Sequence, residues 1–207
     1  ANPYIALALM IWAGLSGIQQ GAELPMPLDV NLYKADEATL AGLKTGSLFS
    51  AEYTSEREFT QEIQTLNRTL VPKGLRALTL RFGKQRALVY VYRPERLQQD
   101  LSSGDARKLL DGLGYDASNA NCCIAHLMQK LRQSEEFPHE IGLFLSYPPG
   151  DVRGFMERRP CKCVGCWKVY GNVEQARRTF RQYKRCTEVY CRRYQNGTTI
   201  DRLTVAG

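Results

Sequence analysis

Residues 75–93, LRALTLRFGKQRALVYVYR, contain two runs rich in leucine, β-branched and aromatic side chains, separated by a short polar turn. Each run, 75–82 and 86–93, has the length of an ordinary strand. Gly83 and Lys84 between them are suited to a tight connection. The stretch therefore predicts a β-hairpin, and with it a fold that contains a sheet.

Helical patterns flank this hairpin on both sides. Ser55 and Glu58 form a capping-box signature, which predicts an amphipathic helix as far as about Val71. Pro94 is expected to start a helix through Leu101. Further elements are predicted as helices over 105–113, 120–133, 152–157 and 173–194, and as a buried strand over 141–147. Together they predict an α+β fold: a small mixed sheet with a hairpin, several helices, and a cysteine-rich C-terminal helical part.

The N-terminal segment has a different character. Residues 3–18 (PYIALALMIWAGLSGI) are almost wholly apolar, with Asn2 as a candidate N-cap and Pro3 at the first helical position. No basic residue precedes Lys34, so the basic region of a signal peptide is missing, and the apolar run is short for a membrane span. We therefore expect an appended apolar helix that packs against other protein, and no membrane insertion.

Composition is that of a soluble globular protein. Hydrophobic residues make up 43% and charged residues 24% of the 207 residues, and the formal net charge is +7. Seven cysteines occur without a secretory signal, which favours a reducing compartment where thiols serve metals or redox chemistry. We therefore expect a cytoplasmic location.

Distinctive motifs run through the larger part of the chain: TLAGLKT (39–45), LVPKG (70–74), FPHEIG (137–142), YPPGDVRGF (147–155), CKCVGCWKVY (161–170), Tyr190-Cys191 and RLTV (202–205). Through these motifs residues 38–207 resemble a bacterial family known as a domain of unknown function, number thirty-seven ninety-three of that series. The resemblance implies no known activity. Such proteins carry a His-Cys pair just before the Thr-Leu-Ala-Gly motif, where this chain has Ala35 and Asp36.

Other motifs mark the start of the chain: ANPY (1–4), AGLSGI (13–18) and NLY (31–33). Through them residues 1–36 resemble the C-terminal region of bacterial glutamine synthetase. In that family the metal-binding glutamates and nucleotide-contacting arginines lie upstream of this region, so the resemblance implies a scaffold helix with no catalytic or cofactor-binding residue. We therefore divide the chain into a glutamine-synthetase-like fragment (1–37) and a basic, cysteine-rich domain (38–207).

The cysteines of the second part suggest a metal centre. Cys161, Cys163 and Cys166 fall within six residues, and Gly165 permits the tight turn that would aim three thiolates at one ion. A fourth thiolate from the following helix would complete the tetrahedral arrangement that zinc or an iron–sulfur cluster prefers. The sequence therefore predicts a ligand set drawn from Cys161, Cys163, Cys166, Cys186 and Cys191.

Several aspects of this centre remain open from the sequence. Cys186 and Cys191 are five residues apart, about 140° on a regular helix, so only one of them is expected to point inward. Lys162, Lys168 and Arg185 are expected to lower the pKa of nearby thiols. Thiols without a ligand, or thiols that exchange in redox chemistry, are the alternatives to a metal.

Two histidines are weaker candidates. His126 follows Cys123 by three residues on the predicted helix, a spacing that could ligate a metal, although a structural histidine beside a core cysteine is favoured. His139 and Glu140 precede the predicted strand, where a polar site or a hydrogen-bonded structural turn would fit, and the turn is favoured.

The C-terminal region is basic and contains interleaved aromatic residues, a combination that can grip phosphates and stack bases. However, Phe180, Tyr183, Tyr190 and Tyr194 recur at helical steps of three and four residues, which favours an aromatic face turned to the core and a solvated basic face.

The sequence thus leaves three functions open. The first is a cytoplasmic metal- or cluster-binding domain with a redox or regulatory role. The second is a domain that binds nucleic acid or another anionic partner, including a protein, through its basic C-terminal tract. The third is the end of a glutamine synthetase fusion, a glutamate–ammonia ligase whose catalytic residues lie outside this sequence. No enzymatic activity is assigned to the residues present.

Overall fold

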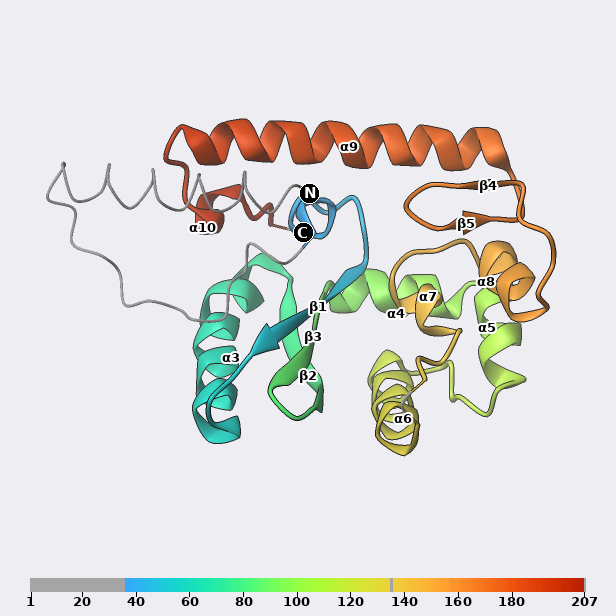
Figure 1. Cartoon of the computed structure of the whole chain (residues 1–207), viewed down its shortest axis with the longest axis horizontal. Helices are drawn as coiled ribbons and strands as arrows, with labels where there is room; N and C mark the ends of the chain where they lie inside the picture. The colour runs from blue at the N-terminus through green and yellow to red at the C-terminus, as the bar shows by residue number, and fades with distance from the viewer. Residues whose placement is uncertain (1–35, 135, 207) are drawn as a thin grey trace, which may run out of the picture.

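A computed structural model of the chain describes residues 36–134 and 136–206 (Figure 1). The apolar helix expected over residues 3–18 and the segment compared with glutamine synthetase lie outside the described residues, except for Asp36. The Asp36 carboxylate caps α2 (Glu37–Leu40) through the Ala38 amide and pairs with Lys44 Nζ at 2.7 Å. Asp36 is therefore built into the structure of the part that follows it.

The predicted hairpin is confirmed as β2 (Arg76–Phe82) and β3 (Arg86–Tyr92), which pair antiparallel. A third strand, β1 (Gly46–Glu52), was not predicted; it pairs antiparallel with the other side of β3, giving the order β1-β3-β2. From Ala87 to Tyr92 every residue of β3 is buried, as expected for a central strand covered on both faces.

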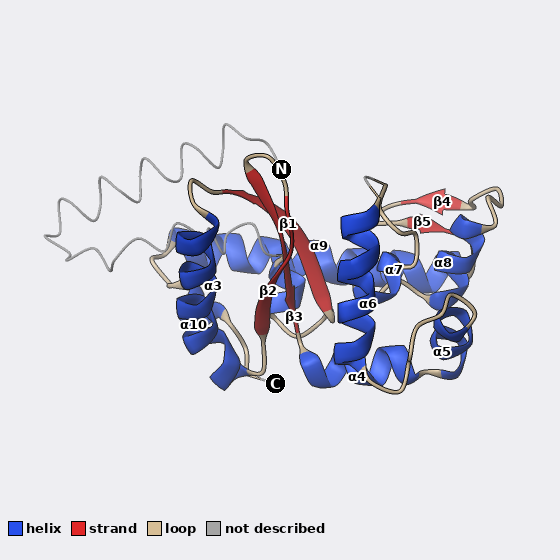
Figure 2. Cartoon of the chain, turned by 90° about the horizontal axis from the view of Figure 1, so that it is seen from below, coloured by secondary structure: helices blue, strands red, loops and turns tan. Residues whose placement is uncertain are grey.

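Alternate side chains of β3 enter two different cores. Val89 and Val91 pack beneath α3 (Glu56–Leu70), which covers one face of the sheet with its own apolar stripe. The Ser55 hydroxyl caps α3 by accepting from the Glu58 amide, as the capping-box signature predicts. Figure 2 shows α3 on one side of the strands and α6 on the other.

The larger core lies on the opposite face, around Tyr90, where the helices between residues 94 and 156 pack. The helices predicted there are confirmed as α4 (Pro94–Ser102), α5 (Gly104–Asp111), α6 (Ala120–Gln133) and α8 (Pro149–Met156). Together with the small antiparallel sheet they establish the mixed α+β class that the sequence predicts.

The strand predicted over 141–147 is wrong, because the chain forms the one-turn helix α7 (Ile141–Phe144) there. Leu143 and Phe144 are buried in the larger core, so the apolar run reflects burial rather than extended backbone. Gly142 sits so close to neighbouring side chains that an added Cβ would lie 2.9 Å from Tyr147 and from Val152.

The predicted C-terminal helix is confirmed as α9 (Val173–Gln195), which runs along one edge of the molecule in Figure 1. Before it, β4 (Cys163–Val164) and β5 (Lys168–Val169) form a small unpredicted hairpin within the cysteine-rich stretch. After it, α10 (Ile200–Leu203) packs back against α9, while the 3₁₀ turn η2 (Val71–Lys73) follows α3. Among the described helices, none has both the length and the apolar character needed to cross a bilayer.

Candidate functional site

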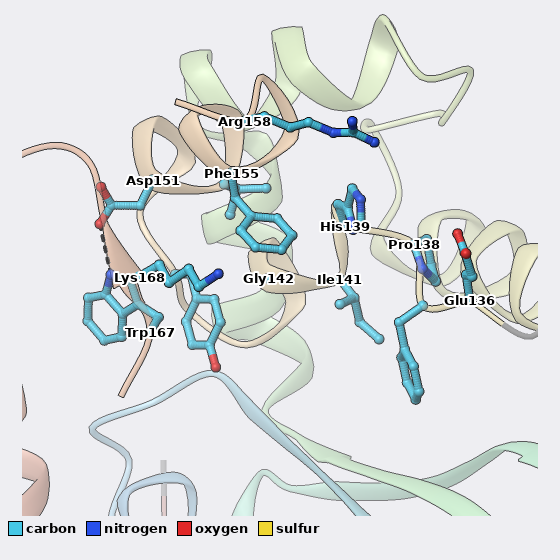
Figure 3. Close-up of a pocket in the computed structure, with 13 residues that line it drawn as sticks. Glu136, Pro138, His139, Ile141, Gly142, Asp151, Phe155, Arg158, Trp167 and Lys168 are labelled. Atoms are coloured by element: carbon cyan, nitrogen blue, oxygen red, sulfur yellow. Dashed lines mark hydrogen bonds between the residues drawn. The ribbon is translucent and has the colours of Figure 1, made fainter. Parts of the chain in front are cut away.

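A cavity of about 740 Å³ opens between the α7–α8 region and the β4–β5 hairpin (Figure 3). Its walls are largely apolar and aromatic, with contributions from Ile141, Tyr147, Val152, Phe155 and Trp167. Its acidic and basic lining residues are Glu136, His139, Asp151, Arg158 and Lys168. Residues from 136 to 168 thus meet in one place, although they belong to separate elements.

Asp151 fixes the position of the small hairpin relative to α8. It lies in the first turn of α8, two residues after Pro149 at the start of this helix, and is 4% exposed. One carboxylate oxygen accepts from Trp167 Nε1 at 2.8 Å, and the other accepts from the amides of Tyr170 and Gly171 at 2.7 Å each. Because all three donors occupy the carboxylate, Asp151 is a structural anchor and leaves the reactive side of the cavity to other groups.

Aromatic packing holds the hairpin from behind. The Trp167 ring stacks on Tyr147 with centroids 5.2 Å apart and meets the edge of Phe180 from α9 at 4.5 Å. Gly165 sits directly on Phe180, since an added Cβ would lie only 2.1 Å from that ring. The tip of the hairpin is therefore seated on α9, and Trp167 forms a fixed wall of the cavity.

Basic groups surround the Phe155 ring, which is 38% exposed to the opening. Lys168 Nζ lies 5.4 Å from the centre of this ring, and the His139 ring meets it edge-on at 4.9 Å. Arg158 follows α8 in the left-handed conformation (φ 54°), and Figure 3 shows its side chain reaching across above His139. With Asp151 occupied, Glu136 is the one remaining acidic lining residue among those described. Such a site can hold a negatively charged group beside an aromatic face.

The adjacent residues His139 and Glu140 have different surroundings and different roles. Glu140 is 4% exposed and accepts from Tyr115 Oη at 2.9 Å and from Lys130 Nζ at 2.7 Å. Burial alone would raise its pKa, but the hydrogen bonds from Lys130 and Tyr115 outweigh burial and lower the pKa below its usual value. The favoured hydrogen-bonded turn is confirmed for Glu140, while His139 faces the cavity.

The predicted core role of Cys123 is confirmed. Its Sγ donates to the Asp116 carbonyl at 3.2 Å, and burial raises the pKa of this thiol to about 11. His126 stacks on Tyr115 with ring centroids 4.2 Å apart. The favoured structural interpretation of this cysteine and histidine pair therefore agrees with their contacts.

The five cysteines of the predicted metal centre are distributed along the hairpin and α9. Cys186 is buried and Cys191 is exposed, which confirms that only one of the two points inward. Phe180, which seats the hairpin tip, lies about 9 Å along the helix from Cys186 and about 16 Å from Cys191. Among the described residues, no three His, Cys, Asp or Glu side chains are grouped as a metal would need, so this ligand set stays a prediction.

The expectation that basic neighbours lower the thiol pKa values is wrong for three of these cysteines. Burial raises the pKa of Cys186 to about 11 and is also the largest cause of the raised pKa values of Cys166 and Cys191. Glu37 raises the pKa of both helix thiols further, and Lys44 lowers that of Cys166 only in part. For these three thiols, desolvation by burial therefore has a larger effect on the pKa than the neighbouring basic residues do.

The sequence did not predict that one site contains Phe155, Arg158, Trp167 and Lys168. Their convergence depends on the β4–β5 hairpin folding back on α8, which no local pattern signals. One signal was nevertheless present, because the motif stretches 137–142, 147–155 and 161–170 all contribute residues to the cavity wall.

Comparison with known proteins identifies the family to which the chain belongs. No curated protein and no solved structure matches the chain, and the resemblance of residues 1–36 to glutamine synthetase gains no support. Residues 32–204 match the family described as "Protein of unknown function (DUF3793)", and this match begins inside the segment that was compared with glutamine synthetase. The match spans most of the sequence and every residue of the cavity, so the chain belongs to the DUF3793 family.

Proposed function

We propose that this domain binds a small anionic ligand with a flat apolar body in the cavity beneath the β4–β5 hairpin. The observation that carries the proposal is the exposed Phe155 ring with Lys168, His139 and Arg158 arranged around it. The aromatic face of Phe155 attracts flat apolar surface, and the neighbouring basic side chains of Lys168 and Arg158 attract negative charge. No covalent chemistry is needed for this function.

Size and charge narrow the ligand class. A cavity of about 740 Å³ falls within the range of about 300–1,000 Å³ that is common for small-molecule sites. Two basic side chains, Arg158 and Lys168, line it, and among the described lining residues Glu136 is the one carboxylate that is not already hydrogen-bonded within the protein. A neutral ligand would leave these cations without a partner, so an anionic group on the ligand is favoured.

Anilinonaphthalene sulfonate, a fluorescent aromatic anion, tests this proposal directly. We expect one molecule to bind per chain and to change the fluorescence of Trp167, which forms a cavity wall. Replacing Arg158→Gln and Lys168→Gln together should weaken binding roughly tenfold or more, because a hydrogen bond to a charged group contributes about 1.5–3 kcal/mol. Titration of the probe with each protein measures the change.

A matched control removes the same charge elsewhere. Arg57→Gln with Lys84→Gln changes two exposed cations on α3 and in the β2–β3 turn, and should leave the probe affinity unchanged. Equal affinity of the Arg158 and Lys168 variant and the wild type would contradict the proposal, as would a wild-type protein that does not bind the probe.

We also propose a metal ion or iron–sulfur cluster at the β4–β5 hairpin, with a redox or regulatory role. The supporting observation is the hairpin itself, in which Cys163 belongs to β4 and Cys166 lies in the turn that connects β4 to β5. Cys161 lies two residues before Cys163, directly ahead of β4, so three of the five thiols fall within one short segment. The inward Cys186, or Cys191, would supply the fourth thiolate for zinc or a cluster.

Anaerobic purification followed by zinc and iron analysis and a visible absorption spectrum tests this second function. We expect close to one equivalent of zinc, or the iron and absorption of a cluster, in the wild type. Cys163→Ser with Cys166→Ser should abolish it, because two of four ligands are lost. Cys122→Ser, at an exposed thiol on α6, should retain it. A wild-type protein free of zinc, iron and visible absorption would rule the centre out.

A further inference from the structure

The outer face of α9 carries a row of exposed cations that the cavity does not use. They are Arg177, Arg181, Lys184, Arg185 and Arg192. At about 100° per residue these five side chains fall within an arc of about 100° on one side of the helix. Glu188 is the acidic residue nearest the middle of that arc, and four of the cations line a shallow depression with it.

These cations have no partner among the described residues. Arg178, on the flank of the row, pairs with Glu174, whereas none of the five forms such an ion pair within the described part of the chain. Like charges at steps of three, four and seven residues repel one another and destabilise a helix. A polyanion lying along this face would remove that repulsion and gain attraction to every side chain in the row.

Three of the four aromatic residues of α9 pack against other parts of the protein. Phe180 packs on Trp167, and Tyr183 packs in the same cluster. The Tyr190 hydroxyl donates to the Leu203 carbonyl at 2.7 Å. This confirms the predicted aromatic face turned to the core. Single-stranded nucleic acids bind such surfaces by stacking their bases on aromatic rings, and these rings are already packed against protein. The interaction that α9 can offer a nucleic acid is therefore contact between its cations and the phosphates.

The shape of the helix selects among phosphate-bearing partners. Arg177 and Arg192 lie about 22 Å apart along α9, which forms an outer edge of the molecule in Figure 1. A helix about 10–12 Å wide fits the major groove of B-form DNA, which is about 12 Å wide, whereas the major groove of duplex RNA is too narrow. We propose that the basic face of α9 binds double-stranded DNA through its phosphates, without reading the bases.

Fluorescence anisotropy with a labelled DNA duplex and the whole chain tests this proposal. Each phosphate neutralised contributes about −0.9 to the slope of log affinity against log salt, so about four contacts give a slope near −3.6. Affinity should then fall roughly a hundredfold between 50 and 200 mM salt. Replacing Arg181, Lys184, Arg185 and Arg192 by glutamine should remove most of the affinity at 50 mM salt and flatten the slope toward zero.

The control variant carries the same loss of four charges at Arg57, Arg68, Lys84 and Arg132, exposed positions outside α9, and should keep most of the affinity. Equal affinities of the two variants would overturn the proposal. Binding of an RNA duplex as tightly as DNA would overturn the groove argument. Binding to anionic phospholipid vesicles, with no DNA binding at 50 mM salt, would assign the face to a membrane and likewise overturn it.

Discussion

Replacing Arg93 by leucine should lower the free energy of unfolding by about 2–4 kcal/mol, since a hydrogen bond to a charged group contributes about 1.5–3 kcal/mol. The Arg93 side chain is 6% exposed and donates to three backbone carbonyls, two in α2 and one near the C-terminal end of the described chain. Its Nε donates to the Thr39 carbonyl at 3.1 Å, and one Nη donates to the carbonyls of Leu40 and Val205 at 2.9 and 2.8 Å. Leucine fills part of the volume but supplies none of these donors. Removing a buried charge offsets part of the loss.

Urea unfolding followed by circular dichroism measures this change. Arg93→Lys should fall between the wild type and the leucine variant, because an ammonium group carries the charge but cannot reproduce the planar fork. Arg107→Leu, at an exposed arginine that lies 3.7 Å from Asp111, should change the unfolding free energy by less than about 1 kcal/mol. A leucine variant at position 93 that unfolds at the same urea concentration as the wild type would show that the three contacts are unimportant.

Asp151→Asn should destabilise the protein by about 3 kcal/mol and loosen the small hairpin over the cavity. The amide that replaces one carboxylate oxygen brings two N–H donors into a buried site where Trp167 Nε1 or the amides of Tyr170 and Gly171 already donate. A buried donor left without an acceptor costs about 1–3 kcal/mol, and the remaining hydrogen bonds lose the strength that the charge gave them.

A second substitution makes this prediction specific. Trp167→Phe removes the indole N–H that conflicts with the new amide, so the double variant should be more stable than the sum of the two single changes implies, by about 1 kcal/mol. Urea unfolding of all four proteins gives this coupling energy. Additive effects would mean that the hydrogen bond from Trp167 to Asp151 contributes nothing. Because the hairpin forms a wall of the cavity, Asp151→Asn should also weaken binding of anilinonaphthalene sulfonate.

Most of the fold could be predicted because its signals are local. The hairpin at 75–93 needs only two short apolar runs and a turn, and α3 needs only the cap at Ser55 and an apolar stripe. The strand predicted over 141–147 shows the limit of this reasoning. A short apolar run is equally consistent with a buried strand and a buried turn of helix, and packing around Gly142 decides between them.

The candidate site could be predicted only in part, because its geometry depends on contacts between distant residues. His139 was recognised as a polar candidate, but nothing in the neighbouring sequence places it against Phe155. Trp167 and Lys168 reach the cavity because long-range contacts hold the hairpin in place, including the hydrogen bonds of Asp151 and the packing on α9. The basic face of α9 was easier to predict, since helical spacing alone separates the aromatic side from the cationic side.

The hydrogen bonds of Arg93 have a consequence for how the protein folds during its synthesis. They join α2, near the start of the described chain, to Val205, and the Val205 amide also donates to the Leu40 carbonyl. During translation the sheet and α2 emerge long before residue 205 does. Nearly the whole described sequence must therefore leave the ribosome before Val205 can form its hydrogen bonds with Arg93 and Leu40. Until then α2 has only part of its final set of contacts.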